Sequence, residues 1–187
     1  VNMHAQSIRN ETVKVFQSIR RFSKEDISKN IIRGQYTSAH IGNRKVNGYR
    51  EEPGVDKNSE TETYVAMKAF IDNWRWSGIP FYIRTGKCLP TRVTEIVIHF
   101  KSTPHYLFKE RYENVDKNNI LVIRIQPDEG ILLKFGIKTP GAGFNTKSVN
   151  MDFRYSDYAD IYIPEAYERL LLDAVHGDAT LYPRSDS

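Results

Sequence analysis

The chain has 187 residues, of which 40% are hydrophobic, 27% charged and 12% aromatic, and its formal net charge is +4. This composition excludes a largely disordered chain, and the length predicts about one domain. The apolar runs, such as 120–123 and 170–172, are far shorter than the roughly 20 residues of a membrane-spanning helix. The single cysteine, Cys88, excludes an internal disulfide and a multi-cysteine zinc site, and indicates a reducing, cytoplasmic setting.

The chain begins at Val1 without an initiator methionine and ends in the polar residues 184–187. No secretory or transit peptide pattern precedes the first predicted helix. We therefore expect an excised part of a longer protein.

Basic residues are concentrated near the start of the chain. Residues 9–33 contain seven basic and three acidic side chains, so this segment alone carries the net charge of +4. One interpretation is an anion-binding or nucleic-acid-binding patch. The alternative is the solvated face of an amphipathic helix, which we favour because an apolar stripe alternates with the basic residues and no aromatic stacking set accompanies them.

The first predicted elements are helical. Ile8, Thr12, Val15, Phe16 and Ile19 recur at helical spacing, which predicts a helix over 8–21 with these residues buried. A short second helical turn is expected at 23–26 with Ser23 as its cap.

An extended segment is predicted at 30–39, followed by a polar surface loop over 40–58. Residues 59–62 have the pattern of a capping box, in which Ser59 and Glu62 satisfy each other's backbone N–H groups. Ala66, Ala69 and Phe70 follow at helical spacing. The pattern predicts a second long helix that ends before Gly78 and Pro80.

From residue 79 the spacing of apolar residues becomes that of β-strands. Predicted strands cover 79–84, 95–100, 120–126, 131–136, 149–155 and 160–163. A last helix is expected over 164–175, with Pro164 in its first turn and Gly177 after its end. Helices followed by a run of hairpin-linked strands indicate an α+β fold with a mainly antiparallel sheet.

The residues 84–87, Arg-Thr-Gly-Lys, are the most suggestive local site, because a predicted strand ends there with two cations beside a glycine. Together with Arg92, they have the chemistry to hold a phosphate or sugar hydroxyls. The alternative is solvated charges at a strand end. The segment is not a P-loop, since Phe81 and Cys88 stand where that motif requires glycine and serine or threonine.

Arg124 and Gln126 lie two residues apart on a predicted strand and therefore share one face of the sheet. This face either lines a ligand cleft or is solvated. None of the five histidines has a paired acid or a second histidine at ligand spacing, so no catalytic residue and no metal site is predicted.

A series of motifs stands in a fixed order along the whole chain. The motifs are Gly34-Gln35-Tyr36, Gly48-Tyr49, Thr61-Glu62-Thr63, residues 73–87, residues 121–129, Lys138-Thr139-Pro140-Gly141, and residues 165–170 with Asp173. In this order and spacing the chain closely resembles the C-terminal domain of glucose-6-phosphate dehydrogenase. The resemblance covers residues 1–187. It implies that they form the substrate-binding and dimerisation domain, with a large, mainly antiparallel sheet and helices packed on one face.

The resemblance implies that the parent enzyme oxidises glucose 6-phosphate to 6-phosphoglucono-1,5-lactone with NADP, the first step of the pentose phosphate pathway. By motif, Lys87, Arg92 and Gln126 correspond to substrate contacts of the family. We expect them to converge with Arg84 at one rim of the sheet and to bind the sugar phosphate, with Arg124 as a further substrate-binding residue. Arg84 and Arg124 correspond to positions that in some animal members touch a second, structural NADP. Val93 and Val97 depart from the basic residues of those members, and we therefore expect no structural NADP here.

The catalytic histidine and the coenzyme-binding Rossmann domain of this family both precede the part that the chain resembles. We therefore expect no cofactor-binding residue and no turnover from the chain alone. The partners implied are glucose 6-phosphate and a second copy bound through the sheet, with no nucleic acid and no membrane. The rival hypothesis is a non-catalytic interaction module that keeps the fold for assembly only.

Overall fold

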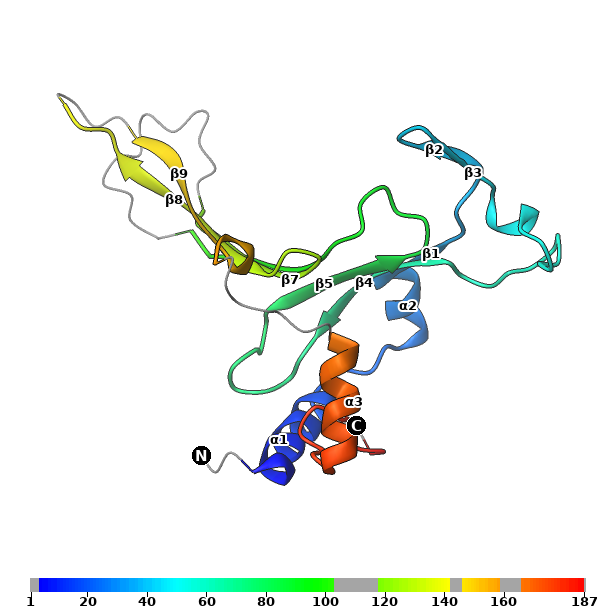
Figure 1. Ribbon diagram of the computed structural model, residues 1–187, viewed down its shortest axis with the longest axis horizontal. Helices are drawn as coiled ribbons and strands as arrows, with labels where there is room; N and C mark the ends of the chain where they lie inside the picture. Colours follow the sequence, from blue (N-terminus) through cyan, green and yellow to red (C-terminus); the bar gives the residue numbers. More distant parts are fainter. Residues whose placement is uncertain (1–3, 103–117, 142–145, 159–165, 187) are drawn as a thin grey trace. The chain divides into compact units, whose positions relative to one another are not determined.

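The computed structural model describes residues 4–102, 118–141, 146–158 and 166–186 (Figure 1). The chain divides into two compact units. The first unit comprises residues 1–90 and 164–187, and the second comprises residues 91–163. Each is described by itself below.

Two helices open the first unit, α1 (Ala5–Gln17) and α2 (Lys24–Asn30). Both predicted helical segments are confirmed. The buried side chain of α1 is Val13, so the predicted buried stripe is wrong: its members Thr12, Val15, Phe16 and Ile19 are exposed. Ser23 caps α2 as predicted: its hydroxyl accepts from the Asp26 N–H at 3.1 Å, and the Asp26 carboxylate accepts from the Ser23 N–H at 3.0 Å.

A three-stranded antiparallel sheet is the centre of the first unit. It consists of β1 (Ile31–Gly34), β4 (Tyr64–Phe70) and β5 (Pro80–Gly86), in the order β1-β4-β5. Helix α2 contacts β1 and β4, and Ala69 of β4 is buried. The end of α1 is tied to the end of β4, because the Arg20 N–H donates to the Phe70 carbonyl at 2.9 Å.

The helix predicted after residue 59 is wrong, because its residues form the central strand β4. The Ser59 hydroxyl accepts from the Thr61 N–H at 3.3 Å and makes a local turn instead of a capping box. The Glu62 carboxylate forms an ion pair with Arg33, a residue of β1. Pairing with β1 and β5 satisfies the backbone of β4 on both sides, and this tertiary context overrides the helical spacing of its alanines.

The prediction of an irregular loop over 40–58 is wrong, because this segment contains regular secondary structure. Strands β2 (Ala39–Ile41) and β3 (Arg44–Val46) pair as an antiparallel hairpin, and a short 3-10 helix, η1 (Tyr49–Glu51), follows. The two strands are joined by Gly42 and Asn43, and Gly42 has a φ of 58°. A glycine adopts this left-handed conformation without the steric cost that a Cβ imposes, so a two-residue turn is accessible here.

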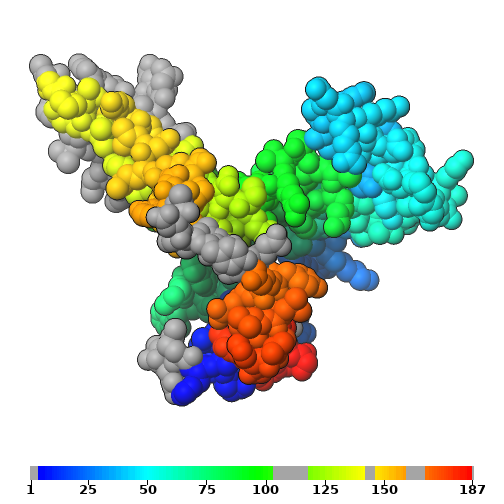
Figure 2. Space-filling model, in the orientation of Figure 1, coloured from blue at the N-terminus to red at the C-terminus, as the bar shows by residue number. Residues whose placement is uncertain are grey.

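The second unit is a four-stranded antiparallel sheet in the order β6-β7-β8-β9. Its strands are β6 (Thr94–His99), β7 (Ile120–Gln126), β8 (Gly130–Lys138) and β9 (Thr146–Arg154), followed by the 3-10 helix η3 (Tyr155–Asp157). The four corresponding predicted strands are confirmed, while the strand expected at 160–163 falls outside the described residues. Figure 2 shows the side chains of β8 and β9, in yellow and orange, lying against one another along the hairpin.

The last helix, α3 (Ala166–His176), belongs to the first unit and confirms the predicted C-terminal helix. Gly177, with a φ of 71°, follows its end as expected. Asp173 is the buried polar residue of the described chain, 4% exposed, and pairs with Arg169 at 3.0 Å. On the outer side of α3, Tyr167 and Val175 remain 72% and 82% exposed.

The predicted α+β class with antiparallel strands is confirmed. The described strands form one three-stranded, one two-stranded and one four-stranded sheet. Among the described hydrophobic residues, Val13 and Ala69 are buried, and many large apolar side chains are exposed. No helix of the described chain is long and apolar enough to cross a membrane.

Candidate functional site

The predicted Arg-Thr-Gly-Lys site lies where β5 ends. Arg84, Thr85 and Gly86 are the last residues of the strand and pair with Ala66, Val65 and Tyr64 of β4. Lys87 follows, and its N–H donates to the Thr63 carbonyl at 2.8 Å. The structure therefore holds the backbone of the lysine against the segment that enters β4.

Glycine is required in this turn by its surroundings. A Cβ on Gly86 would lie 2.8 Å from Cδ2 of Tyr64 and 3.2 Å from the Thr63 carbonyl oxygen, which is closer than normal contacts allow. Cys88, two residues later, has a φ of 52°, an uncommon conformation for a residue with a Cβ. The chain therefore turns tightly around Lys87, with Gly86 close to Tyr64 and Thr63 on one side and Cys88 in a left-handed conformation on the other.

The side chains of Arg84 and Lys87 are both exposed. Neither makes an ion pair with a carboxylate in the part of the chain that the structure describes. A guanidinium and an ammonium without carboxylate partners keep their donors available for an anionic or hydroxyl-rich ligand. This is the chemistry that the sequence predicted for this strand end.

Arg124 and Gln126 both lie on β7 in the second unit, but the register with β6 shifts between them. Arg124 pairs with Glu95 and Gln126 pairs with Thr94, and these two partners are adjacent on β6 and point to opposite faces. The predicted shared face is therefore wrong. The guanidinium of Arg124 is bound to the carboxylate of Asp152 on β9, with Nη1 to Oδ1 at 2.6 Å and Nη2 to Oδ2 at 3.4 Å. This hydrogen bond is the main reason why the pKa of Asp152 lies below its usual range and that of Arg124 above it. Arg124 therefore stabilises the sheet, whereas Gln126, opposite Thr94 of β6, is exposed.

The Arg124–Asp152 contact crosses the intervening strand β8 because that strand has no side chain at Gly130. Arg124 pairs with Gly130, and Gly130 pairs with Arg154, so the three residues share one face of the sheet. Gly130 is buried, and a Cβ there would lie 2.3 Å from the Phe153 carbonyl oxygen. Sequence reasoning missed both Gly130 and Asp152, since their part in the site depends on strand register.

The predicted residues fall in both units. Arg84 and Lys87 belong to the first unit, and the exposed Arg92, with Arg124 and Gln126, belongs to the second. Arg84 and Lys87 lie together at the end of β5, whereas Arg92 precedes β6 and the register shift on β7 separates Arg124 from Gln126. The convergence of the two sets on one ligand stays a prediction.

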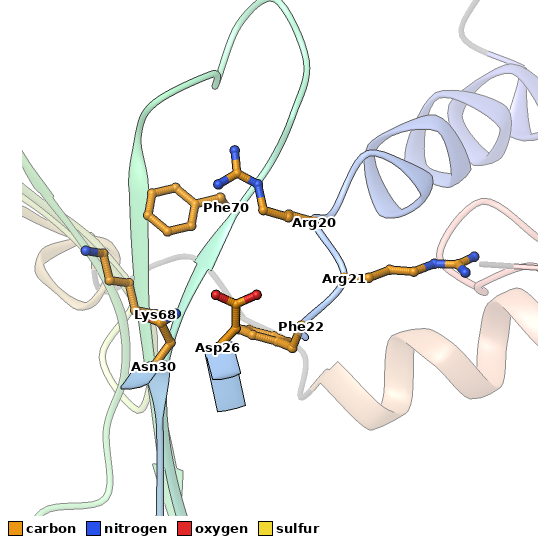
Figure 3. Close-up of a pocket in the computed structure, with 7 residues that line it drawn as sticks. All are labelled: Arg20, Arg21, Phe22, Asp26, Asn30, Lys68 and Phe70. Atoms are coloured by element: carbon orange, nitrogen blue, oxygen red, sulfur yellow. The ribbon is translucent and has the colours of Figure 1, made fainter. Parts of the chain in front are cut away.

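A separate small hollow lies in the first unit and contains none of the predicted site residues (Figure 3). It is lined by Arg20, Arg21, Phe22, Asp26, Asn30, Lys68 and Phe70. Arg20 donates to both carboxylate oxygens of Asp72, at 2.9 and 2.7 Å, and its guanidinium stands 5.0 Å from the centre of the Phe70 ring. These contacts hold Arg20 in place and lower the pKa of Asp72 through the hydrogen bond.

The basic segment 9–33 is partly neutralised by ion pairs. Lys14 pairs with Glu11 at 2.6 Å, Arg20 pairs with Asp72, and Arg33 pairs with Glu62. These pairs agree with the interpretation of a solvated face rather than a nucleic-acid surface. The described residues also contain no group of acids, histidines and cysteine that could hold a metal ion, and His105 lies outside them.

Comparison with known proteins identifies the family. The family model described as "Glucose-6-phosphate dehydrogenase, C-terminal domain" matches residues 1–187. The chain belongs to this family. The glucose-6-phosphate 1-dehydrogenase of Aggregatibacter actinomycetemcomitans is 54% identical over 187 residues, which are 100% of this chain and 37% of that protein. The enzyme of Treponema pallidum is 51% identical over 182 residues, 96% of this chain and 35% of that protein.

Solved structures of glucose-6-phosphate dehydrogenases have the same fold. A glucose-6-phosphate dehydrogenase in complex with its substrate glucose 6-phosphate superposes with a TM-score of 0.84 at 36% identity, covering 100% of this chain and 36% of that one. The glucose-6-phosphate 1-dehydrogenase of Mycobacterium avium gives a TM-score of 0.78 at 34% identity, with coverages of 100% and 36%. The chain thus spans a little over a third of the length of these relatives and corresponds to their C-terminal domain.

Proposed function

We propose that this chain is the substrate-binding part of an NADP-dependent glucose-6-phosphate 1-dehydrogenase. In this proposal, the parent protein oxidises C1 of glucose 6-phosphate to the lactone and passes the hydride to the coenzyme. The observation that supports it most is the turn at the end of β5, where Lys87 and Arg84 are exposed and make no ion pair with a carboxylate among the described residues. In a member of this family, such a turn is suited to hold an anionic sugar.

Lys87 has the role of binding and orienting the substrate. Its ammonium is a compact charge with three donors, and its backbone N–H is already used by Thr63, so only the side chain is available to the ligand. Arg92 and Gln126 are proposed to complete the contacts from the second unit. Arg84 supplies further positive charge in the first unit, and Arg124 acts indirectly, since Asp152 holds its guanidinium.

The residues described do not fit a catalytic coenzyme site. A dinucleotide-binding fold needs parallel strands with a glycine-rich turn before a helix, and the described strands pair only in antiparallel fashion. We infer that the remainder of the parent protein supplies NADP binding and the catalytic base. A second, structural NADP is also not supported, because Val93 and Val97 are exposed apolar residues at the positions in question and Arg124 is held by Asp152.

The test is a Lys87→Ala substitution in the full-length protein, with glucose 6-phosphate and NADP as substrates. We expect kcat/KM for glucose 6-phosphate to fall about ten- to a thousandfold, the range for loss of one charged contact. The matched control is Lys45→Ala, which removes an exposed lysine at a different place, on β3, and should leave kcat/KM unchanged. An unchanged kcat/KM in Lys87→Ala removes Lys87 from the site. The isolated chain should produce no NADPH.

The rival function, a non-catalytic interaction module, makes the opposite prediction for the parent. It expects no dehydrogenase activity in the full-length protein, whatever residue stands at position 87. The retention of two exposed cations on a constrained turn favours the enzyme, because assembly alone does not need them.

We further propose that the parent is a homodimer and that the four-stranded sheet is its interface. Strand register places two complete rows of apolar side chains on one face of this sheet. One row is Ile96, Ile123, Ile131 and Phe153, and the other is Ile98, Leu121, Leu133 and Met151. Met151 is 63% exposed. An apolar sheet face of this extent is typical of an interaction surface, and the proposed occupant is the same face of a second copy.

The dimer is tested by Met151→Lys, which places a charge in the middle of this face. The full-length variant should dissociate in sedimentation-velocity experiments at micromolar concentration. Asn150→Lys is the matched control, since the neighbouring residue points to the opposite face of β9 and should leave the dimer intact. Equal sedimentation of both variants argues against this interface.

We place the protein in the cytoplasm, in keeping with its exposed, unbridged Cys88.

A further inference from the structure

Three segments that are distant in the sequence meet at the Lys87 turn. They are the residues after β1, the residues before β4 and the end of β5. Thr63 joins them: its N–H donates to the Gly34 carbonyl at 2.9 Å, and its own carbonyl accepts from the Lys87 N–H at 2.8 Å. Its hydroxyl accepts from the Tyr36 N–H at 3.0 Å. One side chain and its backbone therefore connect all three segments.

Tyr36 is itself held in place by a second residue, Tyr49. The Tyr36 carbonyl accepts from the Tyr49 N–H at 3.0 Å. The ring of Tyr36 also packs edge-on against Tyr49, with 5.8 Å between the ring centres. Tyr36 is thereby fixed, and the Thr63 hydroxyl is bound to its backbone N–H.

We propose that Thr63 is a positioning residue for Lys87, with Tyr36 as the anchor that its hydroxyl engages. This inference rests on the proposed function, in which Lys87 binds the sugar phosphate. A lysine side chain has four rotatable bonds, so the part of its position that the protein controls is its Cα and the direction of its Cβ. The Thr63–Tyr36 hydrogen bond fixes both, because it holds the carbonyl that binds the Lys87 N–H. Contacts of this kind improve binding because they reduce the conformational entropy that the protein loses when the ligand binds.

The test is Thr63→Val in the full-length enzyme, a nearly isosteric change that removes the hydroxyl and leaves the part-buried Tyr36 N–H without its acceptor. We expect the KM for glucose 6-phosphate to rise about three- to tenfold, the equivalent of one neutral hydrogen bond. The kcat and the KM for NADP should stay within about twofold of the unsubstituted enzyme. Thr63→Ser keeps the hydroxyl and should restore the original KM. A KM that is unchanged in Thr63→Val, or not restored in Thr63→Ser, overturns the proposal.

A double-mutant cycle with Lys87→Ala separates positioning from a general structural role. If Thr63 acts through Lys87, Thr63→Val should have no further effect on the KM for glucose 6-phosphate once the lysine is removed. Additive effects overturn the proposal. If Thr63→Val does not fold, Thr63→Ala carries the same test, because it also removes the hydroxyl and keeps every backbone hydrogen bond.

The two proposals fail in different ways. If Lys87→Ala itself leaves the KM for glucose 6-phosphate unchanged, the proposed function of the turn is wrong. If Lys87→Ala raises that KM and the folded Thr63 variants without the hydroxyl do not, only the positioning role is wrong.

Discussion

Replacing Gly130 by alanine should destabilise the second unit, because β8 has no space for a side chain at this residue. The added Cβ would lie 2.3 Å from the Phe153 carbonyl oxygen and 3.2 Å from the Arg154 Cα, and both are backbone atoms of the neighbouring strand. Strands β8 and β9 must therefore separate locally, and forced overpacking of this kind costs about 1–3 kcal/mol. The same Cβ would lie on the face of the sheet that carries Arg124 and Asp152, whose side chains are partly exposed, so any weakening of their contact adds little.

A matched control exists on the same strand. Gly136 also belongs to β8, yet a Cβ there meets no atom within 4 Å. Gly136→Ala should be neutral or slightly stabilising, since alanine reduces the conformational freedom of the unfolded chain. Any general effect of alanine on this strand is measured by this variant.

Hydrogen exchange in the full-length protein measures the effect locally. A loss of about 2 kcal/mol in the opening free energy makes the amides of β7, β8 and β9 exchange about 30-fold faster in Gly130→Ala. Amides of β4 and β5 should keep their original rates. Equal protection of β8 in the two alanine variants would falsify the steric argument.

Other substitutions test the remaining contacts. Ser23→Ala removes the cap of α2 and should cost about 1 kcal/mol, measured as faster exchange of the α2 amides; Ser28→Ala on the same helix is the control. Asp152→Asn should make the stability of the second unit less dependent on acid. The folded-state pKa of Asp152 is depressed, so its contribution is present above the unfolded value of about 3.9 and is lost as pH falls through the lower folded value. A pH series of exchange rates from pH 6 to pH 2 that is identical in both proteins contradicts this assignment. Arg20→Gln should loosen the end of α1 from β4, and the backbone amides of Arg20 and Asp72 should then exchange faster. Arg21→Gln is the control and should leave these two exchange rates unchanged, because Arg21 has no ion pair among the described residues.

Much of the fold follows from local patterns that are strong enough to survive in any context. Strict alternation in residues 149–155 predicted β9, and the cap at Ser23 predicted α2. The error at β4 has a different origin: Ala66, Ala69 and Phe70 fit a helical face as well as a strand, and only pairing with β1 and β5 decides between them. The hairpin at 39–46 was missed because its strands are only three residues each.

The site shows the same division. The cations at 84–87 could be found because glycine and charge follow a strand in the sequence. The partners of this turn could not, since Thr63 and Tyr36 reach it only through the register of β4 with β5 and the path after β1. Likewise, Asp152 lies 28 residues from Arg124, and no local signal links them.

If the apolar rows of the four-stranded sheet form the proposed interface, assembly of the protein depends on temperature. Association through isoleucine, leucine, methionine and phenylalanine side chains has a large negative heat-capacity change, so it weakens on cooling. The proposed binding of the sugar phosphate by Lys87 depends instead on charge, which dissolved salt screens. Chilling should therefore separate the proposed subunits while the sugar site stays intact, and high ionic strength should weaken the sugar site while the subunits stay together.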